Sequence, residues 1–257
     1  MNDRATKSSG IPWLGEVPAH WEVKRLRFVV QKIGSGKTPK GGAESYATEG
    51  VVFIRSQNVY DDGLRLDDVV YIDDETDEDM SGTRVKPNDV LLNITGASIG
   101  RCAPVPDDLG PANVNQHVAI IRPEREKVDQ RFLHAFLCSQ ATKAAILADE
   151  VGSSREALNF EQIAGLPILL PPLPEQRAIA AFLDERTARI DALVARKRRL
   201  VQLLKEKRQA LITRAVTRGL DPKVKMKESG VPWLGEVPEH WEVKRLRFVV
   251  QKIGSGK

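Results

Sequence analysis

The chain has 257 residues, of which 41% are hydrophobic and 29% charged, a composition that excludes a disordered tail and a miniprotein. No window approaches eighteen uninterrupted apolar residues, and the N-terminus lacks the apolar core of a secretory signal, so we expect a cytoplasmic protein that does not enter the membrane. The net charge of +4 combines a balance of −6 over residues 1–174 (19 basic, 25 acidic), +6 over 175–214 (11 basic, 5 acidic) and +4 over 215–257 (9 basic, 5 acidic).

One segment occurs at both ends of the chain. Residues 9–37 and 229–257 are identical at 27 of 29 positions, at an offset of 220. Because solenoid repeats follow one another directly, this spacing favours one long unit with a period near 220, of which the chain contains one copy and the opening of a second. The second copy either docks on a globular domain or is an unfolded remnant.

Between the copies, residues 38–128 alternate short β-branched runs with turn-forming residues, which predicts an irregular, strand-rich domain. The strands are expected at 51–54, 69–72, 90–94 and 118–121.

Two helices and a last strand are expected after this region. Asp129 is a suitable N-cap for a helix whose apolar residues recur at helical spacing as far as Ile146. Asn159 followed by Gln162 predicts a short capped helix, and residues 166–170 form the last predicted strand.

A single long helix is predicted over residues 174–219. Pro174 suits its first position, and Gly219 followed by Pro222 marks its end; at 1.5 Å per residue it spans about 65 Å. Because cations such as Lys197 and Arg214 interrupt its apolar stripe, antiparallel packing against a second helix is favoured over a parallel zipper. The stripe consists of Leu183, Ile190, Leu193, Val194, Leu200, Val201, Leu204 and Leu211.

The stretch 166–220, LPILLPPLPEQRAIAAFLDERTARIDALVARKRRLVQLLKEKRQALITRAVTRGL, resembles the helical spacer of the specificity subunit of a type I restriction-modification system. Shorter motifs resemble that family's target-recognition domain: GSGKTP (34–39), FIRSQNV (53–59), DVLLNITGASIGRCAPV (89–105), NVNQHVAIIRP (113–123) and GSSREALNF (152–160). The resemblance implies an α+β fold with an irregular, strand-rich target-recognition domain at 1–173, a long helical spacer at 174–219 that pairs antiparallel with a partner helix, and a linker with a truncated second copy at 220–257.

Family members carry two recognition domains and two antiparallel spacers, whereas this chain has one of each. The resemblance therefore implies a half-subunit that binds double-stranded DNA and directs methyltransferase and restriction subunits without catalysing a reaction itself. Two copies joined through the long helix are expected to form a homodimer that reads an interrupted palindrome. A coiled-coil adaptor that binds protein partners is the alternative, because residues 1–174 are acidic.

Candidate DNA contacts are chosen by residue type, since Arg, Gln, Asn, Ser and Thr suit the edges of bases and Lys suits phosphates. Asn and Ser are also common turn residues, so the prediction applies to clusters and not to single positions. The candidates are Ser35, Lys37 and Thr38; Arg55, Ser56, Gln57 and Asn58; Thr95, Ser98 and Arg101; Asn113, Asn115 and Gln116; and Ser153, Ser154 and Arg155.

Other chemistries lack their sequence signatures. A phosphate loop ending at Lys37-Thr38 would need glycine at position 31, which is Gln31, and Pro39 opposes the following helix. Cys102 and Cys138 lie in unrelated contexts without Cys/His ligand spacing, so we expect reduced, structural cysteines, no metal and no cofactor. The acidic run 61–79 is expected to form a solvated surface turned away from DNA.

Overall fold

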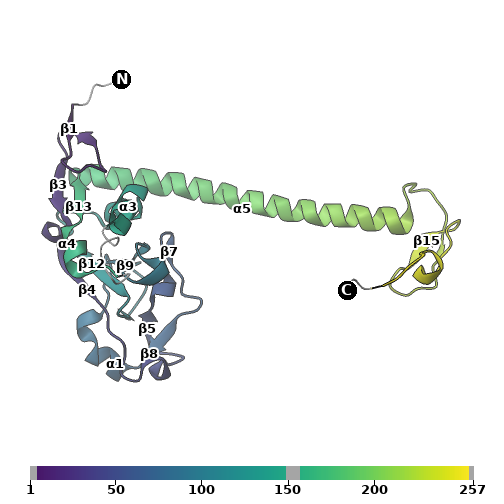
Figure 1. Ribbon diagram of the computed structural model, residues 1–257, viewed down its shortest axis with the longest axis horizontal. Coiled ribbons are helices and arrows are strands. Elements are labelled where there is room, and N and C mark those ends of the chain that lie inside the picture. Colours follow the sequence, from purple (N-terminus) through teal and green to yellow (C-terminus); the bar gives the residue numbers. More distant parts are fainter. Residues whose placement is uncertain (1–4, 149–156, 255–257) are drawn as a thin grey trace. The chain divides into compact units, whose positions relative to one another are not determined.

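The structure is a computed structural model that describes residues 5–148 and 157–254. It divides into two units, residues 1–185 and residues 186–257, and the longest helix, α5 (Leu173–Arg218), extends from the first into the second (Figure 1). Among the described helices, none is long and apolar enough to cross a membrane.

An antiparallel four-stranded sheet forms the centre of the first unit, with the strand order β10-β9-β12-β4. Its strands are β10 (Cys102–Pro104), β9 (Val90–Asn93), β12 (Val118–Pro123) and β4 (Val30–Ser35). The register pairs Leu91 with Ile120. Because successive side chains of a strand point to opposite faces, the apolar runs of β9 and β12 supply both faces of the sheet, and both faces are buried.

A three-stranded sheet lies next to it, with the order β11-β5-β8 and a parallel β11–β5 pair. Its strands are β11 (Ala112–Val114), β5 (Val51–Ile54) and β8 (Val70–Ile72). The remaining strands pair two by two: β1 (Thr6–Ser8) with β2 (Glu16–Pro18), β3 (Glu22–Arg25) with β13 (Pro167–Leu170), β6 (Val59–Tyr60) with β7 (Gly63–Leu64), and β14 (Met226–Glu228) with β15 (Glu236–Pro238).

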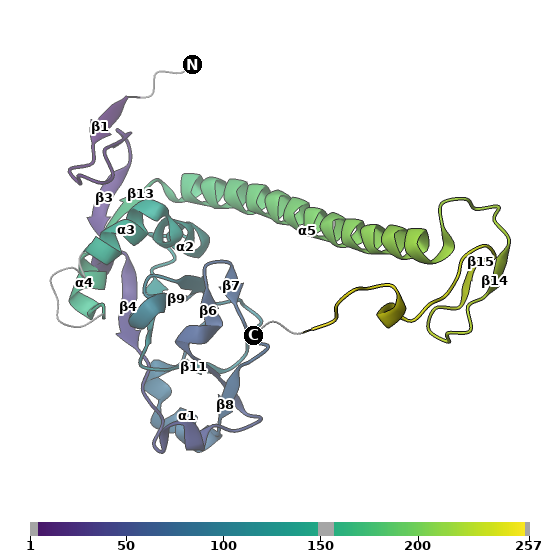
Figure 2. The ribbon, with the colours of Figure 1, turned by 45° about the vertical axis from the view of Figure 1, so that its right-hand side comes forward.

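Short helices cover one face of the four-stranded sheet, where α2 contacts both β9 and β10 (Figure 2). The helices besides α5 are α1 (Asp74–Asp79), α2 (Gln130–Cys138), α3 (Gln140–Ala148) and α4 (Phe160–Gly165). On that face Leu92 and Ile121 join Phe132 and Leu133 in one apolar cluster. On the opposite face Leu91 and Ile120 pack with residues of β5 and β11.

The sequence predicted one helix from Asp129 to Ile146, and the structure corrects this to two. Ser139 has an extended backbone (φ −62°, ψ 144°) that ends α2, and its Oγ accepts a hydrogen bond from the Thr142 amide, which starts α3. A serine side chain competes with the helix for backbone hydrogen bonds and favours a cap. The Asn159/Gln162 capping box of α4 is present as predicted.

Helix α5 is fixed to the first unit by the buried side chain of Gln176, which is 1% exposed. Its Oε1 accepts a hydrogen bond from the Asp129 amide at 2.9 Å, and its Nε2 donates to the carbonyls of Lys127 at 3.1 Å and Pro171 at 2.8 Å. The helix ends at Arg218, where Gly219 takes a left-handed conformation (φ +72°) that glycine adopts readily. With 46 residues, α5 is about 69 Å long.

The two copies of the repeat share their local structure but differ in their long-range pairing. The β1–β2 hairpin, whose first strand lies just before the repeat, recurs as β14–β15 in the same register, because Thr6 pairs with Pro18 and Met226 with Pro238. In the first copy β3 pairs with β13 and β4 with β12, whereas the described residues 242–254 of the second copy contain no strand. The apolar residues after β3 accordingly change from buried Leu26 to a Leu246 that is 65% exposed.

Replacing Gln176 with alanine should destabilise the first unit, because the Asp129 amide and two carbonyls lose their buried partner. Leaving such groups unsatisfied costs about 1–3 kcal/mol, so we expect the urea midpoint to fall. The control is Gln202→Ala, because Gln202 is exposed on α5 and bonds to Glu206 alone among the described contacts. Equal midpoints for the two variants would show that Gln176 does not anchor the helix.

Candidate functional site

Three loops at one end of the two sheets enclose a hollow of about 440 Å³. One loop follows β5, the second joins β9 to β10, and the third joins β11 to β12. The hollow opens to solvent, and both polar and apolar side chains line it. Its lining consists of Ser56, Gln57, Tyr60, Thr95, Gly96, Ala97, Ser98, Arg101 and His117.

Two hydrogen bonds hold these loops to one another. Asn93, at the end of β9, is fully buried, and its Nδ2 donates to the Ser56 carbonyl at 2.8 Å. Thr95 Oγ1 and His117 Nδ1 lie 2.7 Å apart. The first bond joins the end of β9 to the loop after β5, and the second joins the β9–β10 loop to the β11–β12 loop. The three loops are therefore connected to one another.

Five of the predicted contact residues therefore come together in the hollow: Ser56, Gln57, Thr95, Ser98 and Arg101. Sequence reasoning missed Tyr60 and His117. The Arg101 guanidinium carbon lies 4.9 Å from the centre of the Tyr60 ring, which is cation–π distance. His117 follows the predicted Gln116, and its ring Nε2 lies 2.9 Å from Gln116 Nε2.

Two predicted contacts belong to the interior instead. Asn58 is 1% exposed, and its side chain accepts from the Arg55 amide and donates to the Arg65 carbonyl. Asn113 is fully buried, where Thr83 Oγ1 donates to it at 2.6 Å and its Nδ2 donates to Asp77 at 3.0 Å. An amide side chain can satisfy buried polar groups as well as contact a base edge, so we leave both residues out of the candidate interface.

The predicted contact residues close in sequence to Asn58 and Asn113 differ in how far their side chains are exposed to solvent. Arg55 is half-buried and donates to the Asp68 carbonyl at 3.1 Å. Asn115 is buried and accepts from the His117 amide at 3.1 Å, whereas Gln116 is exposed. Gln116 is thus the member of its cluster that presents its side chain beside the hollow.

The predicted residues at the end of β4 lie on a loop that approaches the β11–β12 connection. A Cβ on Gly36 would lie 1.6 Å from the Val114 carbonyl oxygen, so only glycine permits this approach. Lys37 and Thr38 are exposed, and Ser35 is half-buried. No helix follows Lys37 in this described stretch before a 3₁₀ turn at Gly42–Ser45, a geometry unlike a phosphate loop. Ser153, Ser154 and Arg155 lie outside the described residues.

Nine of the ten acidic residues in the run 61–79 are exposed, as expected for a solvated surface, and Asp77 is buried. Some of them also have structural roles. Asp73 caps α1 by accepting from the Thr76 amide at 2.8 Å, and the buried Asp77 pairs with Arg84 at 2.7 Å. Asp61 pairs with Lys143. Burial raises the pKa of Asp61, but the hydrogen bonds from Lys143 and the Cys102 amide outweigh it, so the pKa stays below its ordinary value.

The structure also corrects the prediction that the two cysteines are unrelated. Cys102 Sγ on β10 lies 3.0 Å from Cys138 Sγ at the end of α2, and His134 Nε2 lies 3.3 Å from Cys138 Sγ. The signal that the sequence reasoning overlooked is the spacing of four residues between His134 and Cys138, which puts both on one face of a helix.

These neighbours alter the ionisation of Cys138. The hydrogen bond with Cys102 lowers the pKa of the Cys138 thiol, burial raises it, and the hydrogen bond with His134 lowers it further, so that the net shift is downward. Burial lowers the pKa of His134, but its contact with Cys138 outweighs this, and the net shift is upward.

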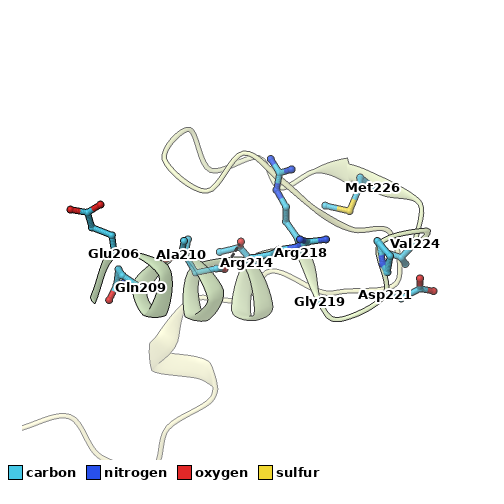
Figure 3. A pocket seen from close by; sticks show the side chains of 12 residues that line it. Glu206, Gln209, Ala210, Arg214, Arg218, Gly219, Asp221, Val224 and Met226 are labelled. Atoms are coloured by element: carbon cyan, nitrogen blue, oxygen red, sulfur yellow. Dashed lines mark hydrogen bonds between the residues drawn. The ribbon is translucent and has the colours of Figure 1, made fainter. Parts of the chain in front are cut away.

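The predicted apolar stripe of α5 is solvent-accessible along most of its length. Leu183 is half-buried, and the other seven members have exposed fractions of 40–59%. In the second unit the segment after Gly219 folds back beside the last turns of α5 and encloses a hollow of about 870 Å³, lined by residues such as Arg214, Asp221 and Met226 (Figure 3). None of the predicted stripe or DNA-contact residues lines it.

Comparisons with known proteins agree on one family. Residues 18–202 match the family model of the type I restriction modification DNA specificity domain. The proposed MjaX type I restriction enzyme specificity subunit of Methanocaldococcus jannaschii is 25% identical over 237 residues, which cover 91% of this chain and 53% of that protein. This chain therefore spans about half the length of that relative.

Two solved structures share the fold. A chain from a structure of complex assembly and conformational transition in the type I R-M system has a TM-score of 0.62 at 22% identity, with 84% of this chain and 49% of that chain covered. The HsdS subunit from Thermoanaerobacter tengcongensis has a TM-score of 0.57 at 21% identity and covers 84% of this chain and 48% of its own. They support the expected α+β fold of a strand-rich region followed by a long helix.

The close approach at Gly36 provides a test of how the β4 loop is held. Gly36→Ala should lower the urea midpoint strongly, because the new methyl group overlaps backbone atoms and overpacking costs about 1–3 kcal/mol or more. Gly34→Ala is the matched control, since its nearest neighbour would lie at 3.6 Å, an ordinary contact. If both alanine variants unfold at the midpoint of the unmodified chain, the loop does not pack as described.

Proposed function

Because the chain belongs to the family of type I restriction modification DNA specificity domains, we propose that it is the DNA-recognition part of a type I restriction-modification complex. In this role it binds double-stranded DNA and catalyses no reaction itself. Separately encoded methyltransferase subunits, and restriction subunits where present, are its partners. The family match over residues 18–202 carries this proposal.

The hollow between the three loops is the proposed site of base reading. It gathers the guanidinium of Arg101, the amide of Gln57 and the hydroxyls of Ser56, Thr95 and Ser98, which are donors and acceptors that suit base edges in the major groove. Lys37 and Thr38, exposed on the β4 loop, are the proposed phosphate contacts. Gln116 extends the site beside His117.

Domain boundaries follow from the same proposal. Residues 1–173 act as the target-recognition domain, residues 174–219 as the spacer, and residues 220–257 as a linker with the second copy of the N-terminal segment. The observed α5, Leu173–Arg218, differs from the proposed spacer by one residue at each end.

The exposed stripe of α5 is the proposed homodimer contact. A second copy of the same helix is its occupant, because aliphatic side chains with exposed fractions of 40–59% recur along one side over 22 residues, from Ile190 to Leu211. Antiparallel pairing of two such helices buries these side chains. It also relates two identical recognition domains by a two-fold axis, which favours an interrupted palindrome as the DNA target.

Arg101→Ala should weaken binding to the specific target by about 1–3 kcal/mol, which is about 5- to 150-fold in affinity, because the base contact of the guanidinium is lost. The target is identified first by mapping methylated sites in cells that express the chain with its methyltransferase. Affinities of the purified modification complex are then measured for target and scrambled duplexes.

The control for this measurement is Arg27→Ala, which removes the same charge from an exposed position away from the hollow. It should leave the ratio of specific to non-specific affinity unchanged. An equal loss on both duplexes in Arg101→Ala would assign Arg101 to a phosphate contact. Salt-independent or absent DNA binding by the unmodified complex would instead favour a protein-binding adaptor, because phosphate contacts release counterions.

Leu204→Glu should shift the chain from dimer to monomer, because it places a charge in the middle of the proposed helix pair, where desolvation is costly. Sedimentation equilibrium over a range of concentrations measures the change. Ala195→Glu is the matched control, since position 195 lies nine residues earlier, on the opposite side of a helix with 3.6 residues per turn. Unchanged self-association in Leu204→Glu would exclude the stripe as the dimer contact.

A further inference from the structure

Three side chains with metal-ligating atoms meet where α2 crosses β10. Cys102 Sγ, Cys138 Sγ and His134 Nε2 all lie within 4.8 Å of one another. Cys102 is fully buried, and the other two are half-buried. Each ligand stands on a regular element, because Cys102 begins β10 and the other two lie one turn apart on α2. Their positions are therefore fixed by backbone hydrogen bonds.

Distances within the cluster suit one shared ion. Tetrahedral zinc holds sulfur at about 2.3 Å and nitrogen at about 2.0–2.1 Å, so neighbouring ligand atoms lie roughly 3.3–3.8 Å apart. The separations here are 3.0 Å between the two sulfurs and 3.3 Å from Cys138 Sγ to His134 Nε2. A movement of less than about 1 Å brings the sulfurs to zinc spacing. The same histidine nitrogen lies 3.2 Å from the Cys102 carbonyl oxygen.

A carboxylate completes the surroundings. Asp61 Oδ1 lies 3.6 Å from Cys138 Sγ and accepts from the Cys102 amide at 3.2 Å. Its other oxygen accepts from Lys143, which ties it to α3. Asp61 is thus a carboxylate close enough to supply an oxygen ligand in a fourth coordination position.

We propose that Cys102, His134 and Cys138 form a binding site for a single zinc ion, with Asp61 or water in the fourth position. Two thiolates and an imidazole select zinc among the common divalent ions, because magnesium and calcium prefer oxygen ligands. The ion would tie α2 to the first residue of β10, next to Arg101 of the hollow. Its role is structural, since two of its ligands lie on a helix that lines no part of the hollow.

The test is the metal content of the 257-residue chain purified in the presence of a phosphine reductant, loaded with zinc and dialysed. We expect about one zinc per chain, as for a structural site, and a thiolate-to-metal absorption band after exchange with cobalt. Cys138→Ser and His134→Gln should each lose most of the bound zinc. Chelation should lower the melting temperature of the unmodified chain but not that of Cys138→Ser.

His240→Gln is the matched control, because it removes a histidine from the second copy of the repeat and should retain the zinc. Circular dichroism of every variant separates loss of the ion from loss of the fold. Should Cys138→Ser fold and still retain the full zinc content, or should the reduced chain bind none, the proposal is overturned. If the chain purified without reductant contains no zinc and its mass is lower by two hydrogens, Cys102 and Cys138 form a disulfide instead.

Discussion

The candidate site depends on one buried amide. Asn93 ends β9 in the four-stranded sheet, its main-chain amide donates to the Arg101 carbonyl, and its side chain donates to the Ser56 carbonyl after β5 of the other sheet. An apolar residue of similar size would fill the same space but leave the Ser56 carbonyl without this donor, at a cost of about 1–3 kcal/mol. The polar loops of two sheets therefore meet at one hollow because a buried amide joins them where the strands end.

Sequence patterns predicted those parts of the fold that rest on local chemistry. The strand at Val51–Ile54 and the capped helix Phe160–Gly165 were predicted because β-branched runs and an Asn/Gln capping box act within a few residues. Strands such as Ala112–Val114 were missed, since three residues carry too little pattern and form a strand only by pairing with β5. Likewise, residue type selected Arg101 and Asn113 together, but only the tertiary fold buries Asn113 completely.

The cluster of Cys102, His134 and Cys138 could likewise be predicted from the sequence only in part. His134 and Cys138 are four residues apart, so their proximity on α2 follows from helical geometry and was available from the sequence. Cys102 is 36 residues from Cys138 in the chain, and its approach requires α2 to pack across β10, a contact that neither element specifies alone. A site assembled from one helix and one strand is thus visible in the sequence only as a pair of ligands, one fewer than the three side chains that we propose for the zinc site.

The repeat separates local from long-range determinants within one molecule. Nearly identical sequences form the same second hairpin strand, β2 and β15, and the same 3₁₀ turn, at Leu26–Phe28 and Leu246–Phe248. Only the first copy also forms β3 and β4. The difference lies in the partners, because β13 and β12 are present for the first copy. Leu26 and Val29 of the first copy are buried, whereas Leu246 and Val249 of the second remain 65% and 60% exposed. The same reasoning applies to α5, whose first turn is held by Gln176 while its apolar stripe beyond Ile190 stays accessible to solvent. Local secondary-structure propensity can form such elements, but their apolar residues are buried only where a partner surface packs against them.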